Sequence, residues 1–287
     1  MNLDPYSVTG FIDAEGCLSI SIVIHPDLKT GWRVKATFLI GLHKKDRMIL
    51  ELILKFFGVG GIKQQGKDSV QYRVTSVKDL MEVIIPHLEK FPLITQKSAD
   101  FILFKQVVNL MYNKEHLTME GFQKILNLKA SMNLGVPMSL KLAFPNIIPV
   151  ERPRIENRVI RNPFWFAGFT SGEGCFMINI SKKYVQLVFS INQHIRDKEL
   201  MENFISYLGC GTFRAKKDHV EIRVTKSKDL TGIIIPFFNK YPIVGVKALD
   251  FADWCKAAEI VKDMSHLSTQ GFKEISQIKA GLNKGRE

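Results

Sequence analysis

The sequence predicts an α+β fold made of two pseudo-symmetric copies of one αββαββα unit, each an antiparallel sheet with helices on one face. Two observations predict it. The second half of the 287-residue chain repeats the first at an offset near 150 residues. Within each copy the apolar residues alternate between a helical period of 3.6 and a strand period of two. A chain of this length is sufficient for two cores of ordinary domain size.

The repeat is visible in short matching segments. The residues YRVT at 72–75 return as IRVT at 222–225, and KDL at 78–80 returns at 228–230, both shifted by 150. Upstream the shift is 151, and at the start EGC at 15–17 returns at 173–175 with a shift of 158. The difference indicates a longer first hairpin loop in the first copy, around residues 25–32. A period this long corresponds to a small domain, so the sequence predicts a fused pseudo-dimer.

Residues 139–162 separate the two copies and are typical of a linker. They carry three prolines and mixed charges without lasting periodicity. We therefore place the first repeat at 1–138, the linker at 139–162 with the joint near Val150, and the second repeat at 163–287.

Within the first copy, the hydrophobic pattern predicts each element in order. Helices are expected at 5–15, 46–57, 77–90, 96–113 and 118–133, and strands at 16–25, 32–42, 61–66 and 69–75. Gly58 is suited to end the second helix. In the first two strands polar residues alternate with apolar ones, which indicates a sheet covered on one face only.

The charge of the chain favours a polyanionic partner. Forty Lys and Arg against 28 Asp and Glu leave a net charge of +12, with a pI near 9.5. The four cysteines form no CxxC pair, which argues against a zinc ribbon or a disulfide framework. There is no apolar run of 18 residues and no signal-like start. We expect a soluble protein that is not imported through a cleaved N-terminal signal.

Each copy opens with an apolar helix that ends in an acid and a glycine, VTGFIDAEG at 8–16 and FAGFTSGEG at 166–174. Small residues recur four apart in both, Gly10 with Ala14 and Gly168 with Gly172. A stripe of small residues lets two helix backbones approach closely. Glycine inside a helix costs about 1 kcal/mol relative to alanine, so a close contact must offset this cost. We expect the two helices to pack against each other.

Glu15 and Glu173 end these two helices. A carboxylate at a helix C-terminus faces the negative end of the macrodipole, which is unfavourable by roughly 0.3 to 1 kcal/mol. Two such groups near each other are explained if divalent cations bind between them, because Mg²⁺ takes one or two carboxylates and shares its other positions with water and phosphate. The alternative is that each Glu simply ends a helix at the surface. Recurrence in both copies of a basic chain disfavours that alternative.

The two segments resemble the motif of LAGLIDADG homing endonucleases, specifically the single-chain type with two repeats. Both keep the glycine, the acid at the eighth position and the closing glycine, whereas Asp13 of the first copy is replaced by Ser171 in the second. The resemblance covers nearly the whole chain. It implies a site-specific double-strand DNA endonuclease, encoded within an intron, that hydrolyses one phosphodiester per strand and leaves 3′ overhangs.

The resemblance also implies the roles of individual residues. Glu15 and Glu173 are the expected catalytic metal-binding acids, and the metal site is expected to include the glycines that follow them, Gly16 and Gly174. Lys97 and Lys247 correspond to the family's basic residues near the scissile phosphates, although solvated helix lysines are the alternative. Gln193 corresponds to a polar residue that positions water, and Leu42 occupies that place in the first copy. The implied cofactor is Mg²⁺ or another divalent cation such as Mn²⁺, with Ca²⁺ binding without supporting cleavage.

The polar positions of the strands are the candidate DNA contacts. A strand of about ten residues runs roughly 33 Å, and two sheets forming a DNA-binding saddle would cover on the order of 20 base pairs in the major groove. The alternative is a solvated sheet face. The candidates in the first copy are Ser19, Ser21, Arg33, Lys35, Thr37, Gln65, Gln71, Arg73 and Thr75. Those in the second are Met177, Asn179, Ser181, Gln186, Ser190, Asn192, Arg214, Lys216, Glu221, Arg223 and Thr225. Because the two sets differ, we expect an asymmetric target.

Other functions remain open at this stage. By resemblance, a relative that binds nucleic acid without cutting, or an RNA maturase acting on intron RNA, is the strongest alternative. A basic structural protein explains the charge but not the paired motifs. Two pairs of recurring histidines, His43 with His194 and His116 with His266, are interpreted as structural. We expect double-stranded DNA as the partner, no membrane association, a monomer, and a mitochondrial location by family resemblance.

Overall fold

The computed structural model describes residues 3–156, 158–181 and 184–283 of the chain. The chain divides into two compact units. The first comprises Glu15–Asn157, and the second comprises Arg158–Glu287 together with Leu3–Ala14. This division differs from the expected repeat boundaries, because it groups the first helix with the second repeat.

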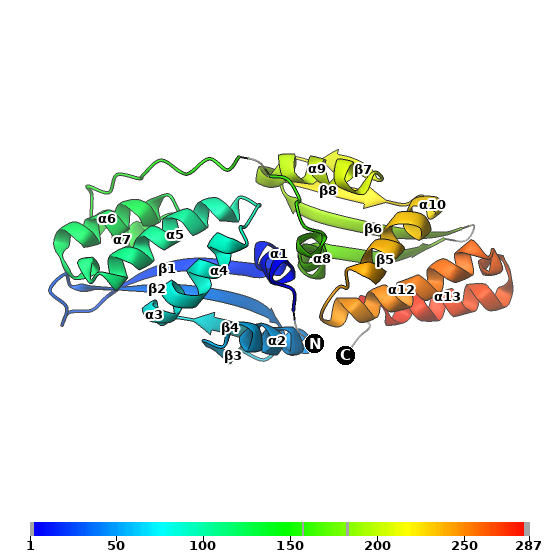
Figure 1. The fold of residues 1–287 in the computed structure, drawn as a ribbon, viewed down its shortest axis with the longest axis horizontal. Helices are drawn as coiled ribbons and strands as arrows, with labels where there is room; N and C mark the ends of the chain where they lie inside the picture. The colour runs from blue at the N-terminus through cyan, green and yellow to red at the C-terminus, as the bar shows by residue number, and fades with distance from the viewer. Residues whose placement is uncertain (1–2, 157, 182–183, 284–287) are drawn as a thin grey trace. The chain divides into compact units, whose positions relative to one another are not determined.

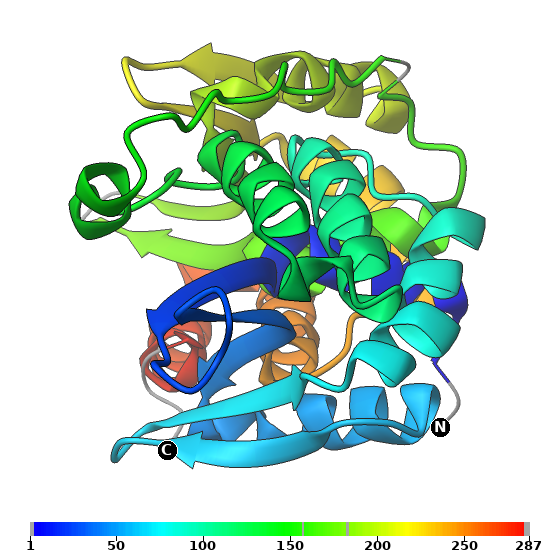
Figure 2. The ribbon, with the colours of Figure 1, turned by 90° about the vertical axis from the view of Figure 1, so that its left-hand side faces the viewer.

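The first unit contains one antiparallel four-stranded sheet in the order β1-β2-β4-β3. The strands are β1 (Gly16–Ile24), β2 (Trp32–His43), β3 (Gly61–Gln65) and β4 (Ser69–Val74). The helices are α2 (Arg47–Phe57), α3 (Val77–Asp79), α4 (Ile85–Lys90), α5 (Lys97–Tyr112), α6 (Met119–Ala130) and α7 (Met138–Ala143). Short 3-10 turns, η1 (Lys44–Asp46) and η3 (Glu115–Leu117), precede α2 and α6. Helices α5 and α6 lie side by side (Figures 1 and 2), and α5 packs against β1 and β2.

The second unit repeats this arrangement with a sheet in the order β5-β6-β8-β7. Its strands are β5 (Gly174–Ile180), β6 (Val185–His194), β7 (Thr212–Ala215) and β8 (His219–Val224). Its helices are α8 (Pro163–Glu173), α9 (Lys198–Leu208), α10 (Ser227–Asp229), α11 (Ile235–Lys240), α12 (Val246–Lys262) and α13 (Thr269–Gly281), joined by all but the last residue of α1 (Pro5–Glu15). The 3-10 turns η4 (Ile195–Asp197) and η6 (Ser265–Leu267) repeat those of the first unit.

Each sheet has one covered and one open face. In the first unit, Leu18, Phe38 and Tyr72 are fully buried on the covered face, whereas Ser21 and Lys35 are exposed on the other face. Successive side chains of a strand point to opposite faces, so this alternation places the core between sheet and helices. The α+β fold of two antiparallel sheets predicted from the sequence is confirmed.

Two expected segments differ in detail. The single helix expected at 77–90 is interrupted by a π-helical turn, η2 (Leu80–Ile84), in which the amide of Ile85 donates to the carbonyl of Leu80. The turn precedes Pro86, which has no amide proton and crowds the preceding turn, so a wider turn accommodates it. The second unit has the same turn, η5 (Leu230–Ile234), before Pro236. The expected linker at 139–162 begins with a short helix, α7, in place of irregular chain.

Helices α1 and α8 touch backbone to backbone within the second unit. A methyl group added at Gly10 would lie 2.0 Å from the carbonyl oxygen of Trp165, and one added at Gly168 would lie 2.0 Å from that of Ser7. No side chain fits at either position, because real Cβ atoms do not approach other atoms so closely. The predicted pairing of the two opening helices is therefore confirmed, and it explains why the first helix belongs to the second unit.

Polar bonds beside this crossing differ between the two repeats. Asp13 is 2% exposed, and its Oδ2 accepts a 2.9 Å hydrogen bond from the indole nitrogen of Trp165. Ser171, the counterpart of Asp13, instead donates to the carbonyl of Ala167 at 2.8 Å and accepts from the amide of Val244 at 3.1 Å. The replacement of Asp13 by Ser171 therefore comes with a different set of bonds.

We predict that Gly10→Ala and Gly168→Ala each lower the free energy of unfolding by about 1 to 3 kcal/mol, despite the better helix propensity of alanine, because the new methyl overlaps a carbonyl. Urea denaturation checks this. Gly232→Ala is the matched control, since its methyl meets no atom within 4 Å. A loss of stability in the control equal to that in the other two variants would contradict the steric explanation.

His87 lies in an aromatic cluster of the first unit. Its ring centroid is 5.4 Å from that of Phe56 and 5.1 Å from those of Phe57 and Phe91. Burial among these rings lowers the pKa of His87 to about 4. In the second unit Phe237 occupies the position 150 residues later, so the same cluster there carries no titrating group at this position.

We predict that His87 makes stability depend on pH between about 6.5 and 4. In this window the unfolded chain binds a proton at His87 that the folded chain does not, so the free energy of unfolding decreases as the pH falls. His87→Phe, which copies the second unit, should flatten this part of the curve in urea denaturation across the range. A slope in His87→Phe equal to that of the wild type would contradict this explanation.

Candidate functional site

The candidate DNA contacts of the first unit lie on the open face of its sheet. Ser19 pairs with Thr37 and Ser21 with Lys35, and Gln71 and Arg73 project on the same side of β4 because they alternate with buried residues. Thr75 continues this alternation one residue beyond β4. The structure therefore brings all nine candidates of this copy to one face, as predicted.

The open face of the first sheet is basic. Its strands carry Arg33, Lys35, Lys63 and Arg73 and contain no Asp or Glu. The sequence reasoning missed Lys63, which pairs with Gln71 in the register. Its spacing of two from the candidate Gln65 was the signal that could have identified it.

Arg73 is held in place by its neighbours on this face. Its Nε donates to Oε1 of Gln71 at 2.7 Å, and its Nη2 donates to Oε1 of Gln65 at 2.9 Å. Arg33 contacts the ring of His25 in the adjoining loop. These bonds fix the direction of two of the cations, which limits the rotamer entropy that binding a phosphate or a base would cost.

The second sheet presents its candidates on the corresponding face. Asn179 pairs with Gln186, Asn192 with Glu221, and Arg214 with Glu221. The remaining candidates alternate with core residues in the same sense, with Ser181, Lys216 and Thr225 each one residue beyond a strand end. Glu221 lies 3.9 Å from Arg223 and partly offsets its charge. The two open faces therefore differ in charge as well as in residue identity.

Two of the candidates are less accessible than the sequence suggested. Ser190 is 0% exposed and Thr37 is 8% exposed. Ser190 lies between Cys175 and Arg223 in the register, at the centre of the sheet, where larger neighbours flank it on both sides. The alternating pattern identified the correct face, but it could not indicate which small side chains are covered by their neighbours.

Three of the candidate catalytic residues converge in the second unit. Glu173 is the last residue of α8, and its Oε1 accepts a 3.0 Å hydrogen bond from Nε2 of Gln193 on β6. Lys247, in the first turn of α12, donates its ammonium group to the carbonyl of Gly172. A carboxylate, an amide and an ammonium group thus meet at the end of one helix.

The first unit places its own candidates in matching positions. Lys97 is the first residue of α5, and its charge partly offsets the burial that raises the pKa of the Cys17 thiol. Lys247 acts on Cys175 in the same way. Each lysine is therefore close to the residue that lies two positions after the helix-terminal Glu.

Leu42 occupies the place of Gln193 in the first sheet. Leu42 pairs with Val70, and Gln193 pairs with the equivalent Val220. This identical register confirms that the two positions correspond, as the sequence alignment of the repeats indicated. A hydrogen bond like the one from Gln193 to Glu173 cannot form at Leu42, because its side chain has no donor.

The glycines after the helix-terminal acids begin the first strand of each sheet. Gly174 has φ −70° and ψ 149°, an extended conformation, and not the left-handed one with which Gly58 ends α2. A methyl group at Gly174 would lie 2.4 Å from Cγ2 of Thr170. Glycine is therefore needed for space and not for a positive φ.

The donor set is suited to a cation that shares its ligands with the substrate. Among the described residues, no three His, Cys, Asp or Glu side chains form a cluster that could hold an ion. The candidates are single carboxylates beside a backbone turn, and Mg²⁺ is commonly held by one or two carboxylates plus water and phosphate oxygens. The site fits such a cation and not a structural zinc, which needs four protein ligands.

The recurring histidines have structural surroundings. Nδ1 of His43 accepts from the amide of Lys45 at 3.3 Å, and Nδ1 of His194 accepts from that of Arg196 at 3.1 Å, so both begin 3-10 turns. Nδ1 of His116 and that of His266 are buried. Burial lowers the pKa of His116. The bonds of His43 and His194 agree with the structural interpretation, whereas the buried Nδ1 atoms of His116 and His266 have no hydrogen-bond partner among the described residues.

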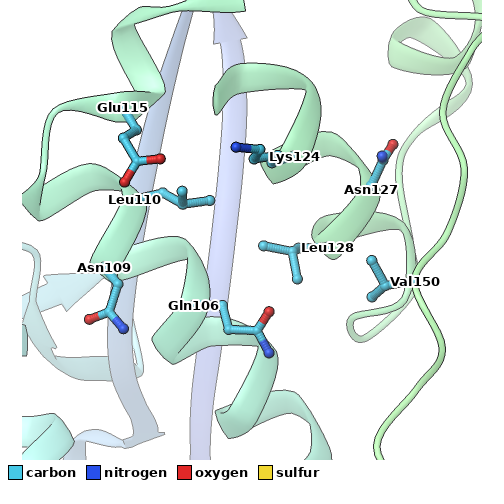
Figure 3. Close-up of a pocket in the computed structure, with 8 residues that line it drawn as sticks. All are labelled: Gln106, Asn109, Leu110, Glu115, Lys124, Asn127, Leu128 and Val150. Atoms are coloured by element: carbon cyan, nitrogen blue, oxygen red, sulfur yellow. The ribbon is translucent and has the colours of Figure 1, made fainter. Parts of the chain in front are cut away.

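A pocket lies on the helical side of the first unit, between α5, α6 and the chain that follows α7. Figure 3 shows its lining residues, in which Leu110, Leu128 and Val150 are surrounded by polar side chains. None of the candidate catalytic or DNA-contacting residues lines it. In the part of the chain that is described, no helix is long and apolar enough to cross a membrane.

The protein is a two-repeat α+β protein. Each repeat has a sheet with one open face and an opening helix that ends in an acid, and the two opening helices cross at glycines. The family model described as LAGLIDADG endonuclease matches residues 8–108 and 166–258. The chain belongs to the LAGLIDADG endonuclease family.

Two similar curated proteins come from the fungus Neurospora crassa. The chain is 41% identical to Probable intron-encoded endonuclease 3 of Neurospora crassa over 97% of its own length and 54% of the relative. It is also 41% identical to Probable intron-encoded endonuclease 2 of the same fungus, over 98% of its own length and 65% of the relative. The chain thus spans between half and two thirds of the length of these relatives.

Solved structures match along their whole length. The I-SmaMI LAGLIDADG homing endonuclease bound to cleaved DNA is 44% identical, with a TM-score of 0.97 over 99% of this chain and 98% of that one. I-SmaMI has also been solved with an uncleaved DNA target in the presence of calcium ions, with a TM-score of 0.95. The LAGLIDADG homing endonuclease I-GzeII in complex with its DNA target is 43% identical, with a TM-score of 0.95 over 99% of this chain and 100% of that one.

Proposed function

We propose that the chain is a homing endonuclease that hydrolyses one phosphodiester in each strand of a long, asymmetric DNA target. The observation that carries the proposal is the meeting of Glu173, Gln193 and Lys247 at the end of α8. Glu15 and Lys97 have the matching positions in the first repeat. Family membership and the DNA-bound relatives at 43% and 44% identity support the same activity.

Glu15 and Glu173 hold the divalent cations in this proposal, together with the backbone at Gly16 and Gly174. Each acid is the last residue of its helix and follows the crossing glycine of that helix by five positions. Bound Mg²⁺ supplies an activated water and stabilises the charge of the leaving oxygen. The structure of I-SmaMI with uncleaved target and calcium supports a divalent cation as cofactor.

The other candidate side chains orient Glu173 and a water, and neutralise charge on the scissile phosphates. Gln193 fixes the rotamer of Glu173 through its 3.0 Å hydrogen bond, and its Oε1 accepts from the amide of His194 at 3.1 Å. The second hydrogen of its Nε2 is the group that would orient a water. Lys97 and Lys247 balance the negative charge that gathers on the scissile phosphates. Because Leu42 cannot act as Gln193 does, we propose that the two strands are cut at different rates.

The open sheet faces bind the DNA in this proposal. The basic side chains Arg33, Lys35, Lys63 and Arg73 suit phosphate oxygens and guanine edges. The difference between the two faces supports an asymmetric target. Binding as a monomer follows from the presence of both repeats in one chain.

The gene is proposed to lie in a fungal mitochondrial intron. Relatives include intron-encoded endonucleases of Neurospora crassa and an Uncharacterized mitochondrial protein RF1 of Saccharomyces cerevisiae, 27% identical over 42% of this chain. The protein would then act in the same compartment, and the position of its reading frame in the organelle genome is the direct check.

We predict that Glu15→Gln and Glu173→Gln each abolish double-strand cleavage while the protein stays folded. Glutamine preserves the size of the side chain but removes the charge that a divalent cation requires. The measurement is cleavage with Mg²⁺ of a target selected by the wild type from a randomised duplex library. Full activity in either variant, or no cleavage of any library member by the wild type, would contradict the nuclease.

Gln193→Leu, which copies Leu42, offers a sharper test of the unequal halves. We expect it to slow the cut of one strand by about tenfold or more and to leave the other cut near the wild-type rate, because only one carboxylate loses its orienting partner. Each strand of the selected target carries its own end label, and single-turnover rates are read separately. Equal slowing of both strands would argue against separate roles.

We predict that Lys35→Ala and Arg73→Ala weaken binding to the selected target and reduce the slope of log affinity against log salt by about 1 each. Fluorescence anisotropy with Ca²⁺ in place of Mg²⁺ measures both quantities without cleavage. Lys78→Ala is the control, since Lys78 lies on a helix and carries the same charge. A control slope that falls as far as those of the sheet variants would contradict the proposed binding face.

A further inference from the structure

The chain that joins the two repeats is bonded to the helices of the first unit. The amide of Val150 donates to the carbonyl of Asn127 at 3.4 Å, and the amide of Ile148 donates to Oδ1 of the same residue at 3.0 Å. The hydroxyl of Ser131 donates to the carbonyl of Val150. Figure 3 shows Val150 beside Asn127 and Leu128 of α6. We call residues 144–156 the joining segment.

Arg152 is the most extensively bonded residue of the joining segment. It binds the carboxylate of Asp100 with two parallel bonds of 2.8 and 3.0 Å. It also donates to the carbonyls of Ser131 at 2.9 Å and Gln96 at 3.2 Å. A two-pronged guanidinium–carboxylate pair is among the strongest and most directional polar contacts in proteins. The bonds to Asp100 raise the pKa of Arg152, so its charge is retained.

These bonds surround the first turn of α5, where Lys97 lies. Gln96 immediately precedes Lys97, and Asp100 follows it within the same turn. Arg152 thus hydrogen-bonds to the carbonyl of Gln96, just before Lys97, and to the side chain of Asp100, three residues after it. Asp100 is 2% exposed, so its position is fixed by its partners and not by solvent.

The same carboxylate is connected to the strand that follows Glu15. Oδ1 of Asp100 accepts from the amide of Asn133 at 2.9 Å, and Nδ2 of Asn133 donates to the carbonyl of Leu18 on β1 at 2.9 Å. One hydrogen-bond network therefore connects the first turn of α5, which carries Lys97, to Leu18 of β1. Leu18 lies three residues after Glu15.

The described residues of the second unit repeat the Asp–Asn part of this network. Asp250 accepts from the amide of Asn283 at 3.0 Å, and Asn283 donates to the carbonyl of Phe176 at 3.1 Å. The Asp–Asn bridge is thus common to both repeats. The arginine is supplied by the joining segment, which lies against the first unit.

We propose that Arg152 is a positioning residue for Lys97, so that the joining segment tunes the cut of one DNA strand and not the other. The inference rests on the proposed nuclease activity. Removal of Arg152 takes from the buried Asp100 its two-pronged hydrogen-bonded partner and from the carbonyl of Gln96, which precedes Lys97, its donor. A shift of about 1 Å in a group near the reacting phosphate slows a reaction by up to about a hundredfold.

The test uses the full-length protein with Arg152→Ala and Arg152→Lys, and the target selected by the wild type. Arg154→Ala is the matched control, because Arg154 is exposed in the same segment and its loss removes the same charge. Lys97→Met identifies which strand depends on the first unit. Each strand is end-labelled, single-turnover rates are measured with Mg²⁺, and affinity is measured with Ca²⁺.

We expect Arg152→Ala to slow the strand that Lys97 serves by about tenfold or more, with nicked product accumulating and affinity unchanged. Arg152→Lys keeps the positive charge but cannot form the two parallel hydrogen bonds to Asp100, so we expect an intermediate rate for this strand. This variant provides the test if the alanine variant does not fold. Arg154→Ala should cut both strands at the wild-type rates. Purely structural damage would instead slow both strands together or weaken binding.

Three results would overturn the inference. These are equal slowing of both strands, slowing of the strand that Lys247 serves, and wild-type rates in both Arg152 variants. Any of them, obtained with a wild type that cuts its target, would leave the proposed nuclease activity intact. Failure of the wild type to cut any target would overturn the nuclease activity and the inference together.

Discussion

The backbone contact between α1 and α8 is the constraint on which the remaining features depend. Gly10 and Gly168 leave no room for a Cβ atom against the partner helix, so each helix must retain its glycine for the crossing to form. The contact also attaches the first helix to the second unit, while the strand that follows it belongs to the first unit. The acids that end these helices are thereby carried on sterically restricted helices, which suits groups that must be held rigidly.

Within this constraint the two repeats have diverged at polar positions. Asp13 binds the indole of Trp165, whereas its counterpart Ser171 binds backbone groups. Gln193 holds Glu173 while Leu42 offers no donor at the equivalent place. The fold tolerates these differences because the two repeats share the apolar positions of their cores, and these differences lie outside those positions. Divergence of this kind gives one scaffold two unequal halves without a change of topology.

The joining segment adds an asymmetry that duplication alone does not produce. Arg152 completes a buried network at Asp100, and Arg158, which begins the second unit, contacts the buried Asp197 at 3.4 Å. Each charge is paired and hydrogen-bonded, as burial requires. Because the chain between the repeats forms these ion pairs, it is part of the packed structure of each unit. Its composition of prolines and mixed charges does not predict these contacts.

The sequence by itself determined the repeat, the order of helices and strands, the face of each sheet that carries polar residues, and the candidates Glu15, Glu173, Lys97, Lys247 and Gln193. The repeat, the order of elements, the polar faces and the acids Glu15 and Glu173 follow from local periodicity and internal repetition. Lys97, Lys247 and Gln193 follow only from the resemblance to the LAGLIDADG family. Only the tertiary structure decided that Ser190 is covered by its neighbours on adjacent strands and that Arg152 bonds to the turn that carries Lys97. Each of these depends on contacts between residues far apart in the chain, for which periodicity carries no information.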